Sequence, residues 1–132
     1  MGKNKNPEAD IQIAIVAWCR QSDNFFLRHI FAVSNGFNLR EVGLRVKAVR
    51  MGQLAGMPDL CVMFPTKIVW LEVKAAGGSM SGNQRKIKQM LTDKQWNFLH
   101  SVHRVRSLEE AQKILLKEEI VSDPLAEGVR GM

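Results

Sequence analysis

Two acidic side chains and one lysine have the types and spacing to hold a divalent metal ion. Asp59 follows the tight turn Gly56-Met57-Pro58, and Glu72 and Lys74 end the apolar segment that comes next. Carboxylate oxygens suit Mg²⁺, and an ammonium group beside them can stabilise charge on a phosphate. The alternative is a turn-capping aspartate and a surface Glu–Lys pair. Charged groups that end an apolar strand need a partner or a function, which favours the metal site.

Two predicted strands bring these residues to one edge of a sheet. Residues 60–64 and 68–71 are rich in β-branched and aromatic side chains, and Pro65-Thr66-Lys67 between them predicts a turn. Side chains alternate along a strand, so Glu72 and Lys74 are expected on one side and Val73 on the other. The turn returns the chain past the same edge, where Asp59 should lie.

The remaining segments predict a mixed α/β domain. Asn6-Pro7 begins a helix whose apolar stripe includes Ile11, Ile15, Trp18 and Cys19. The other expected elements are a strand over 25–33, a helix over 39–51, a helix over about 83–101 with a break near 92–93, a strand over 102–106 and a last helix begun by a capping box at 107–110. This order gives a small mixed sheet flanked by helices, with a crossover between residues 68 and 106.

Composition and charge limit the possible functions. The chain has 132 residues, which we interpret as one domain over 1–121 with a flexible tail over 122–132. No apolar stretch is long enough to span a membrane, and the polar N-terminus is unlike a signal peptide. Cys19 and Cys61 lack metal-ligand spacing and are typical of buried, reduced thiols in a cytoplasmic protein. A net charge of +6 indicates a polyanionic partner.

Four motifs together identify a family resemblance. The first helix carries Glu8-Ala9-Asp10-Ile11-Gln12, an Asn-Gly element stands at Asn35-Gly36, and a basic segment at 45–52 leads to the core. The core pairs Gly56-Met57-Pro58-Asp59 with Leu71-Glu72-Val73-Lys74, and a Gly-x-x-Ser-x-x-Gln stretch follows at 78–84. From about residue 8 to residue 118, the chain resembles the VRR-NUC domain, a branch of the PD-(D/E)XK nuclease superfamily. The resemblance implies a restriction-endonuclease-like α/β core.

The resemblance also implies a role for each site residue. Asp59 and Glu72 would hold Mg²⁺ or Mn²⁺ with the backbone carbonyl of Val73, and Glu8 would reach the metal through a water molecule. Lys74 would orient or help activate the attacking water. The motif glutamine would complete the site, and two positions compete for it. A helix starting near Gln95 is too short for a crossover before the strand over 102–106, so spacing favours Gln84.

Basic residues on both sides of the core predict a nucleic-acid surface. The candidate DNA-binding residues are Asn35, Arg45, Lys47, Arg50, Arg85, Lys86 and Lys88. The resemblance implies a metal-dependent DNA endonuclease acting on branched, junction or flap DNA in replication, recombination or repair. It also implies a homodimer of bacterial or bacteriophage type, with no membrane partner and no small-molecule cofactor.

Two alternatives stay open. The same fold could bind branched DNA or a partner protein without cutting, although a pure binder has no need of the Asp59, Glu72 and Lys74 set. An RNA or tRNA-intron nuclease could use the same metal site, and nothing in the sequence separates DNA from RNA.

Overall fold

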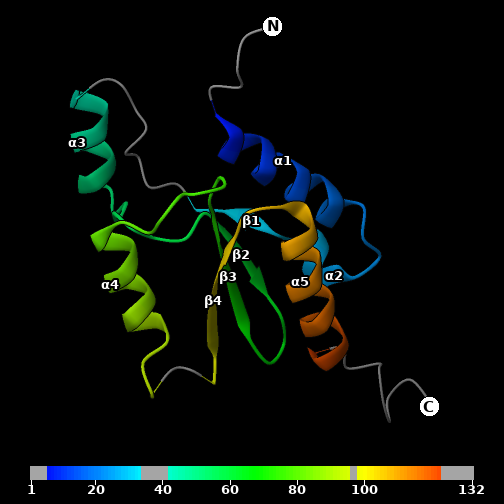
Figure 1. Cartoon of the computed structure of the whole chain (residues 1–132). Helices are drawn as coiled ribbons and strands as arrows, with labels where there is room; N and C mark the ends of the chain where they lie inside the picture. Colours follow the sequence, from blue (N-terminus) through cyan, green and yellow to red (C-terminus); the bar gives the residue numbers. More distant parts are fainter. Residues whose placement is uncertain (1–5, 34–41, 96–97, 123–132) are drawn as a thin grey trace, which may run out of the picture.

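The computed structural model describes residues 6–33, 42–95 and 98–122, and these form a four-stranded mixed sheet flanked by helices (Figure 1). The strands are β1 (Phe31–Ala32), β2 (Leu60–Met63), β3 (Ile68–Val73) and β4 (His100–Val105), and they lie in this order across the sheet. β2 pairs in antiparallel fashion with both β1 and β3, whereas β3 and β4 are parallel. The mixed α/β class predicted from the sequence is therefore confirmed.

Helix α1 (Pro7–Arg20) begins where the sequence predicts. The side chain of Asn6 accepts a hydrogen bond from the Ala9 N–H at 3.0 Å, and Pro7 occupies the first helical turn. Ile15 and Cys19 are fully buried, so the predicted apolar stripe does face the interior. This capped start fixes the position of Glu8 in the first turn.

The hydrophobic core lies between the sheet and the pair α1 and α5 (Leu108–Ser122). Alternate residues of β3, including Val69 and Leu71, pack with Ile15 of α1 and with Ala111 and Leu115 of α5. The other residues of β3, including Glu72, point to the opposite face, on the side of α4 (Gly82–Leu91). The active-site candidates thus lie at the end of a strand whose other face is anchored in the core.

Helix α3 (Val42–Arg50) lies at the margin of the molecule, on the same side of the sheet as α4 (Figure 1). It falls within the predicted helix over 39–51, of which residues 39–41 lie outside the described part. Its Ala48 is buried, while most of its large apolar side chains are exposed.

The prediction of a strand over residues 25–33 was wrong for the first half of that segment. Residues 25–28 form the short helix α2 (Phe25–Arg28), and only β1 is extended. The Asn24 side chain accepts hydrogen bonds from the Phe26 and Leu27 N–H groups at 2.9 and 3.1 Å. This cap starts a helical turn and buries Leu27, which outweighs the β-propensity of the two phenylalanines.

The crossover helix is shorter than predicted. α4 ends at Leu91, next to the expected break, and the Thr92 hydroxyl at this end donates to the Lys88 carbonyl at 2.7 Å. The described residues between Thr92 and Leu99 form turns rather than further helix, and β4 begins two residues earlier than expected. The parallel pairing of β3 and β4 around α4 confirms the crossover itself. Residues 123–132, most of the predicted tail, lie outside the described residues.

Candidate active site

The register of β2 and β3 brings the two core carboxylates together. Leu60 pairs with Leu71, so Asp59 and Glu72, the next residue outward on each strand, lie opposite one another. The Oδ2 atom of Asp59 accepts a hydrogen bond from the Val73 N–H at 2.8 Å. This bond holds the aspartate against the end of β3, as the turn at 56–58 predicted.

Glu72 is an ionisable residue buried in an otherwise apolar strand, with 1% of its surface exposed. Its Oε1 atom accepts a hydrogen bond from Gln84 Nε2 at 2.7 Å, while its Oε2 atom is buried and accepts none from the described residues. Burial raises the pKa of Glu72 to about 8, the charge of Asp59 and a side-chain hydrogen bond with it raise the pKa further, and the ammonium of Lys74 partly opposes these effects. The nearby lysine therefore offsets only part of the cost of burying this acid.

Gln84 links helix α4 to the carboxylate pair. The Ser81 hydroxyl accepts a hydrogen bond from the Gln84 N–H at 3.2 Å, and Gln84 Oε1 accepts one from the Ser81 N–H at 2.8 Å. This capping box fixes the side chain so that its NH₂ group points at Glu72. Gln95, the competing candidate, lies in the turn after α4, at the opposite end of that helix. The geometry therefore favours Gln84.

A glycine that received no role in the sequence analysis sets the approach of α4. Gly56 has a φ of +89°, and a Cβ atom placed there would lie 2.5 Å from the carbonyl carbon and oxygen of Asn83 and 2.8 Å from the Gln84 nitrogen. The turn at 56–58 thus packs against the backbone at the start of α4. A glycine two residues before a Pro-Asp pair is a signal for such a close approach.

Lys74 lies just beyond Glu72 at the end of β3, and Glu8 comes to the same edge from α1. The Lys74 N–H donates to the Val105 carbonyl at 2.9 Å, which holds the residue at the end of the β3–β4 ladder. Gly78 packs beside the aliphatic stem of Lys74, since a Cβ there would lie 3.5 Å from two of its carbons. Glu8 Oε1 accepts a hydrogen bond from the Ala75 N–H at 3.4 Å. Four chain segments therefore meet at this edge of the sheet.

The donor set fits a hard divalent cation. The unpartnered Glu72 oxygen and the adjacent Asp59 carboxylate are oxygen ligands, which Mg²⁺ prefers, and a cation would relieve the buried negative charge. Within the described ranges, no three His, Cys, Asp or Glu side chains gather closely enough to form a metal site on their own.

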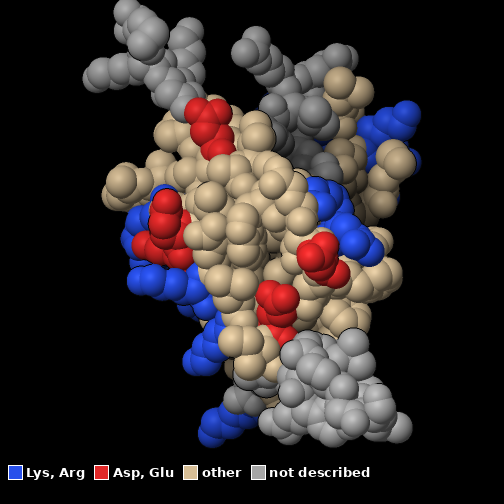
Figure 2. Space-filling model, turned by 90° about the vertical axis from the view of Figure 1, so that its right-hand side faces the viewer, with Lys and Arg blue, Asp and Glu red and all other residues tan. Residues whose placement is uncertain are grey.

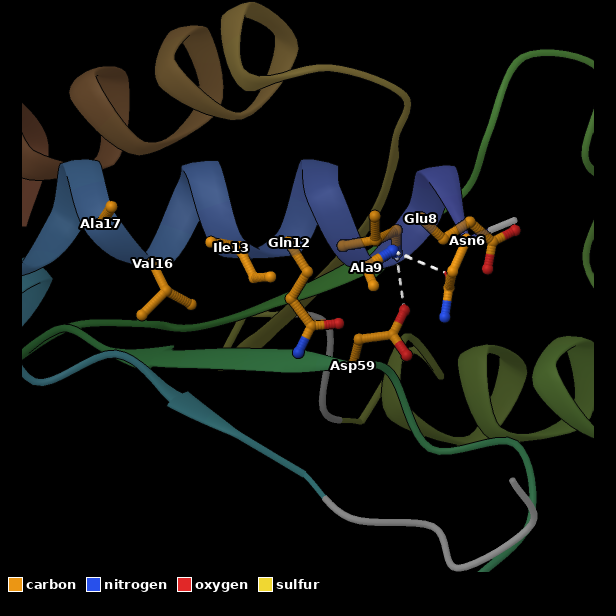
Figure 3. A pocket seen from close by; sticks show the side chains of 9 residues that line it. Asn6, Glu8, Ala9, Gln12, Ile13, Val16, Ala17 and Asp59 are labelled. Atoms are coloured by element: carbon orange, nitrogen blue, oxygen red, sulfur yellow. Dashed lines mark hydrogen bonds between the residues drawn. The ribbon is translucent and has the colours of Figure 1, made fainter. Parts of the chain in front are cut away.

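Glu8, Asp59 and Val73 also line one end of a cleft of about 570 Å³ between α1 and the edge of the sheet (Figure 3). Gln12 lines the same cleft, one helical turn after Glu8. Gln12 belongs to the motif at residues 8–12 but was not predicted to be a site residue. Its i, i+4 spacing from Glu8 places it on the same helix face and could have identified it.

The predicted cationic residues belong to two helices on one side of the sheet. Arg45, Lys47 and Arg50 lie on α3, and Arg85, Lys86 and Lys88 on α4; all are exposed except Arg45, which is half-buried. Asn35 lies outside the described residues. From the side of α5, the molecule shows a largely uncharged surface with scattered acidic groups and cations toward its edges (Figure 2). No helix of the described chain is long and apolar enough to cross a membrane.

Comparison with known proteins gives a consistent result. A family model described as the VRR-NUC domain matches residues 3–107. A solved structure titled VRR_NUC domain protein has a TM-score of 0.66 and covers 88% of this chain and 90% of its own, with 17% sequence identity, so the likeness is one of fold. The comparison with curated proteins gives no match. The resemblance predicted from the motifs is confirmed.

Proposed function

Because the chain belongs to the VRR-NUC domain family, we propose that it is a divalent-metal-dependent endonuclease that hydrolyses DNA, with branched, junction or flap DNA as its substrate. The observation that carries this proposal is the buried Glu72, whose Oε2 atom has no described hydrogen-bond partner and lies beside Asp59. Two adjacent acids at a buried position cost stability unless a proton or a cation neutralises them, and a protein that only binds DNA gains nothing from that cost.

The residues divide the work of the site among them. Asp59, Glu72 and the Val73 carbonyl would hold Mg²⁺ or Mn²⁺, which when bound polarises a phosphoryl oxygen and lowers the pKa of water. Gln84 fixes the rotamer of Glu72 through its 2.7 Å hydrogen bond, so that the free oxygen keeps one orientation. The Lys74 ammonium would stabilise the negative charge that develops on the phosphate and orient the attacking water. Glu8 would position an outer water.

DNA would be held mainly through its backbone. The exposed cations of α3 and α4 lie on the same side of the sheet as Glu72, so phosphates on both sides of the cut would meet positive charge. Such contacts position the substrate without reading its sequence. This arrangement supports selectivity for the shape of the DNA rather than for its bases.

We further propose that the protein acts as a homodimer. Val42, Val46 and Val49 follow one another at helical spacing on α3 and are 62, 52 and 48% exposed, and the nearby Met51 and Leu54 are also exposed. Apolar groups gathered on a surface in this way are typical of interfaces. Sedimentation analysis tests the assignment. Val46→Ser should shift a dimer toward monomer, whereas Ile120→Ser, which removes a more exposed apolar side chain on α5, should not.

Cleavage of a labelled substrate panel tests the activity. The panel holds linear duplex, single strand, flap, four-way junction and a structured RNA, each with Mg²⁺, Mn²⁺ or EDTA. Asp59→Asn and Lys74→Ala should abolish cutting, while Lys113→Ala, which removes an exposed lysine from α5, should cut normally. Thermal melts show whether each variant is folded.

The pattern of results separates the alternatives. Metal-dependent cutting of branched DNA, lost in both site variants, supports the proposal, and preferential cutting of the RNA would change the substrate class. Tight binding of one DNA structure with no cutting under either metal would instead identify a binding module.

A further inference from the structure

The cleft along α1 extends the candidate site in one direction. Its catalytic end is formed by Glu8, Asp59 and Val73, and its far end by Ile13, Val16 and Ala17 (Figure 3). At about 570 Å³ it falls within the size range of small-molecule pockets, roughly 300–1,000 Å³. A phosphate placed at Asp59 would therefore have a hollow of ligand size next to it.

Two features of the lining would suit a ligand. Ile13 is 65% exposed although an α1 residue on the solvent side would ordinarily be polar. Gln12, half-buried in the wall, makes no side-chain hydrogen bond with any described residue. An exposed branched apolar group beside an amide with unused donors and acceptors matches a ligand that has a flat apolar face and a polar edge.

We propose that this cleft binds an unpaired nucleobase adjoining the scissile phosphate. The proposal rests on the proposed nuclease function and adds a subsite to it. The base would lie against Ile13 and Val16, and the Gln12 amide would hydrogen-bond to its edge. Bases within a stacked duplex have neither face free, whereas an unpaired base does. The cleft thus favours DNA with an unpaired nucleotide at the cut over continuous duplex.

Cleavage kinetics test the base directly. The substrate is a DNA flap in which single nucleotides on either side of the cut are replaced, one at a time, by an abasic sugar. One such replacement should lower kcat/KM of the wild-type protein about tenfold, the order expected for loss of one buried apolar contact. Ile13→Ala should lower kcat/KM on the intact flap by a similar factor and should show no further loss on the abasic flap, because both changes remove the same contact.

Matched variants separate the cleft from general effects. Ile120→Ala removes an isoleucine that is 72% exposed on α5, and Gln112→Leu is the counterpart there of Gln12→Leu. Both controls should keep the wild-type response to the abasic sugar. If Ile13→Ala and Gln12→Leu also keep it, the base does not bind in this cleft and the proposal is overturned.

A binding measurement separates this proposal from the nuclease proposal. The fluorescent base 2-aminopurine is placed at the same positions of the flap and mixed with the Lys74→Ala protein in Mg²⁺, where no cutting is expected. A fluorescence change that Ile13→Ala removes and Ile120→Ala retains supports the subsite, even if the wild-type protein cuts nothing. Absence of any change at every position, or failure of the flap to bind, would refute it.

Discussion

Replacing Gly56 by alanine tests whether the turn at 56–58 positions the site. A Cβ atom at this position would lie 2.5 Å from the Asn83 backbone, 0.9 Å short of the 3.4 Å at which ordinary contact begins. Its nearest neighbours would be backbone atoms of Asn83 and Gln84, so no flexible side chain can move aside. Either the turn or the start of α4 must shift by about 1 Å, and such a shift would lengthen the 2.7 Å hydrogen bond between Gln84 and Glu72.

Two other glycines isolate the steric part of this effect. Gly77 and Gly52 also have positive φ, +82° and +105°, but a Cβ atom at either would meet nothing within 4 Å. Alanine in the left-handed region costs about 1–2 kcal/mol, and this cost is shared by the three variants. Overpacking adds about 1–3 kcal/mol at Gly56 alone. We therefore expect Gly56→Ala to lose about 2–5 kcal/mol and Gly77→Ala about 1–2 kcal/mol.

Urea unfolding followed by circular dichroism measures these losses, and cleavage of a flap substrate measures the consequence for the site. Misplacement of catalytic groups by about 1 Å can cost roughly 100-fold in rate, so Gly56→Ala should lose activity on that scale. Gly52→Ala, outside the site, should cut like the wild type. Equal stability losses at all three positions, or full activity of Gly56→Ala at a temperature where it is folded, would refute the role assigned to the turn.

Three further predictions concern titration and charge. Burial raises the pKa of Glu72 to about 8 from its usual 4.5, so between these pH values the unfolded chain releases a proton that the native metal-free protein retains. The stability of the protein in EDTA should therefore fall as pH rises through this window. Glu72→Gln should remove that part of the pH dependence in thermal melts. Burial raises the pKa of Cys19 and Cys61 to about 12, so both thiols should resist a thiolate-specific reagent at pH 8 and react in denaturant; rapid reaction of the folded protein would contradict their burial. Arg85→Ser should reduce the slope of log affinity for DNA against log salt concentration by about 0.9, the value for one phosphate contact, and an unchanged slope would exclude that contact.

The local parts of the fold could be predicted because their signals are carried by adjacent residues. Asn6-Pro7 specifies the start of α1, and the apolar segments on either side of Pro65 specify β2 and β3. Once these two strands pair as a hairpin, the meeting of Asp59 and Glu72 follows from the register. The chain places its core carboxylates by local geometry, which explains why a short motif could reveal them.

The rest depends on contacts between distant segments. Nothing within residues 25–33 shows that the cap at Asn24 and the burial of Leu27 outweigh the strand preference of Phe25 and Phe26. The contact that favours Gln84 over Gln95 is likewise made across the chain, by a hydrogen bond to Glu72, twelve residues earlier. Sequence spacing favoured the same glutamine only because the crossover needs a helix of sufficient length.

Hydrogen bonds to Asp59 and Glu72 fix the orientation of both carboxyl groups. Each core acid has one oxygen held by the protein, Asp59 by the Val73 N–H and Glu72 by the Gln84 amide. Both donors are themselves fixed, one within the β3 backbone and the other by the capping box of α4. These contacts hold the two acids close together, and burial of Glu72, with a further contribution from the neighbouring Asp59, raises its pKa to about 8. A divalent cation bound to both acids would offset the cost of burying them. The hydrogen bonds from the Val73 N–H and the Gln84 amide, as much as the acids themselves, should therefore determine how strongly such a metal binds.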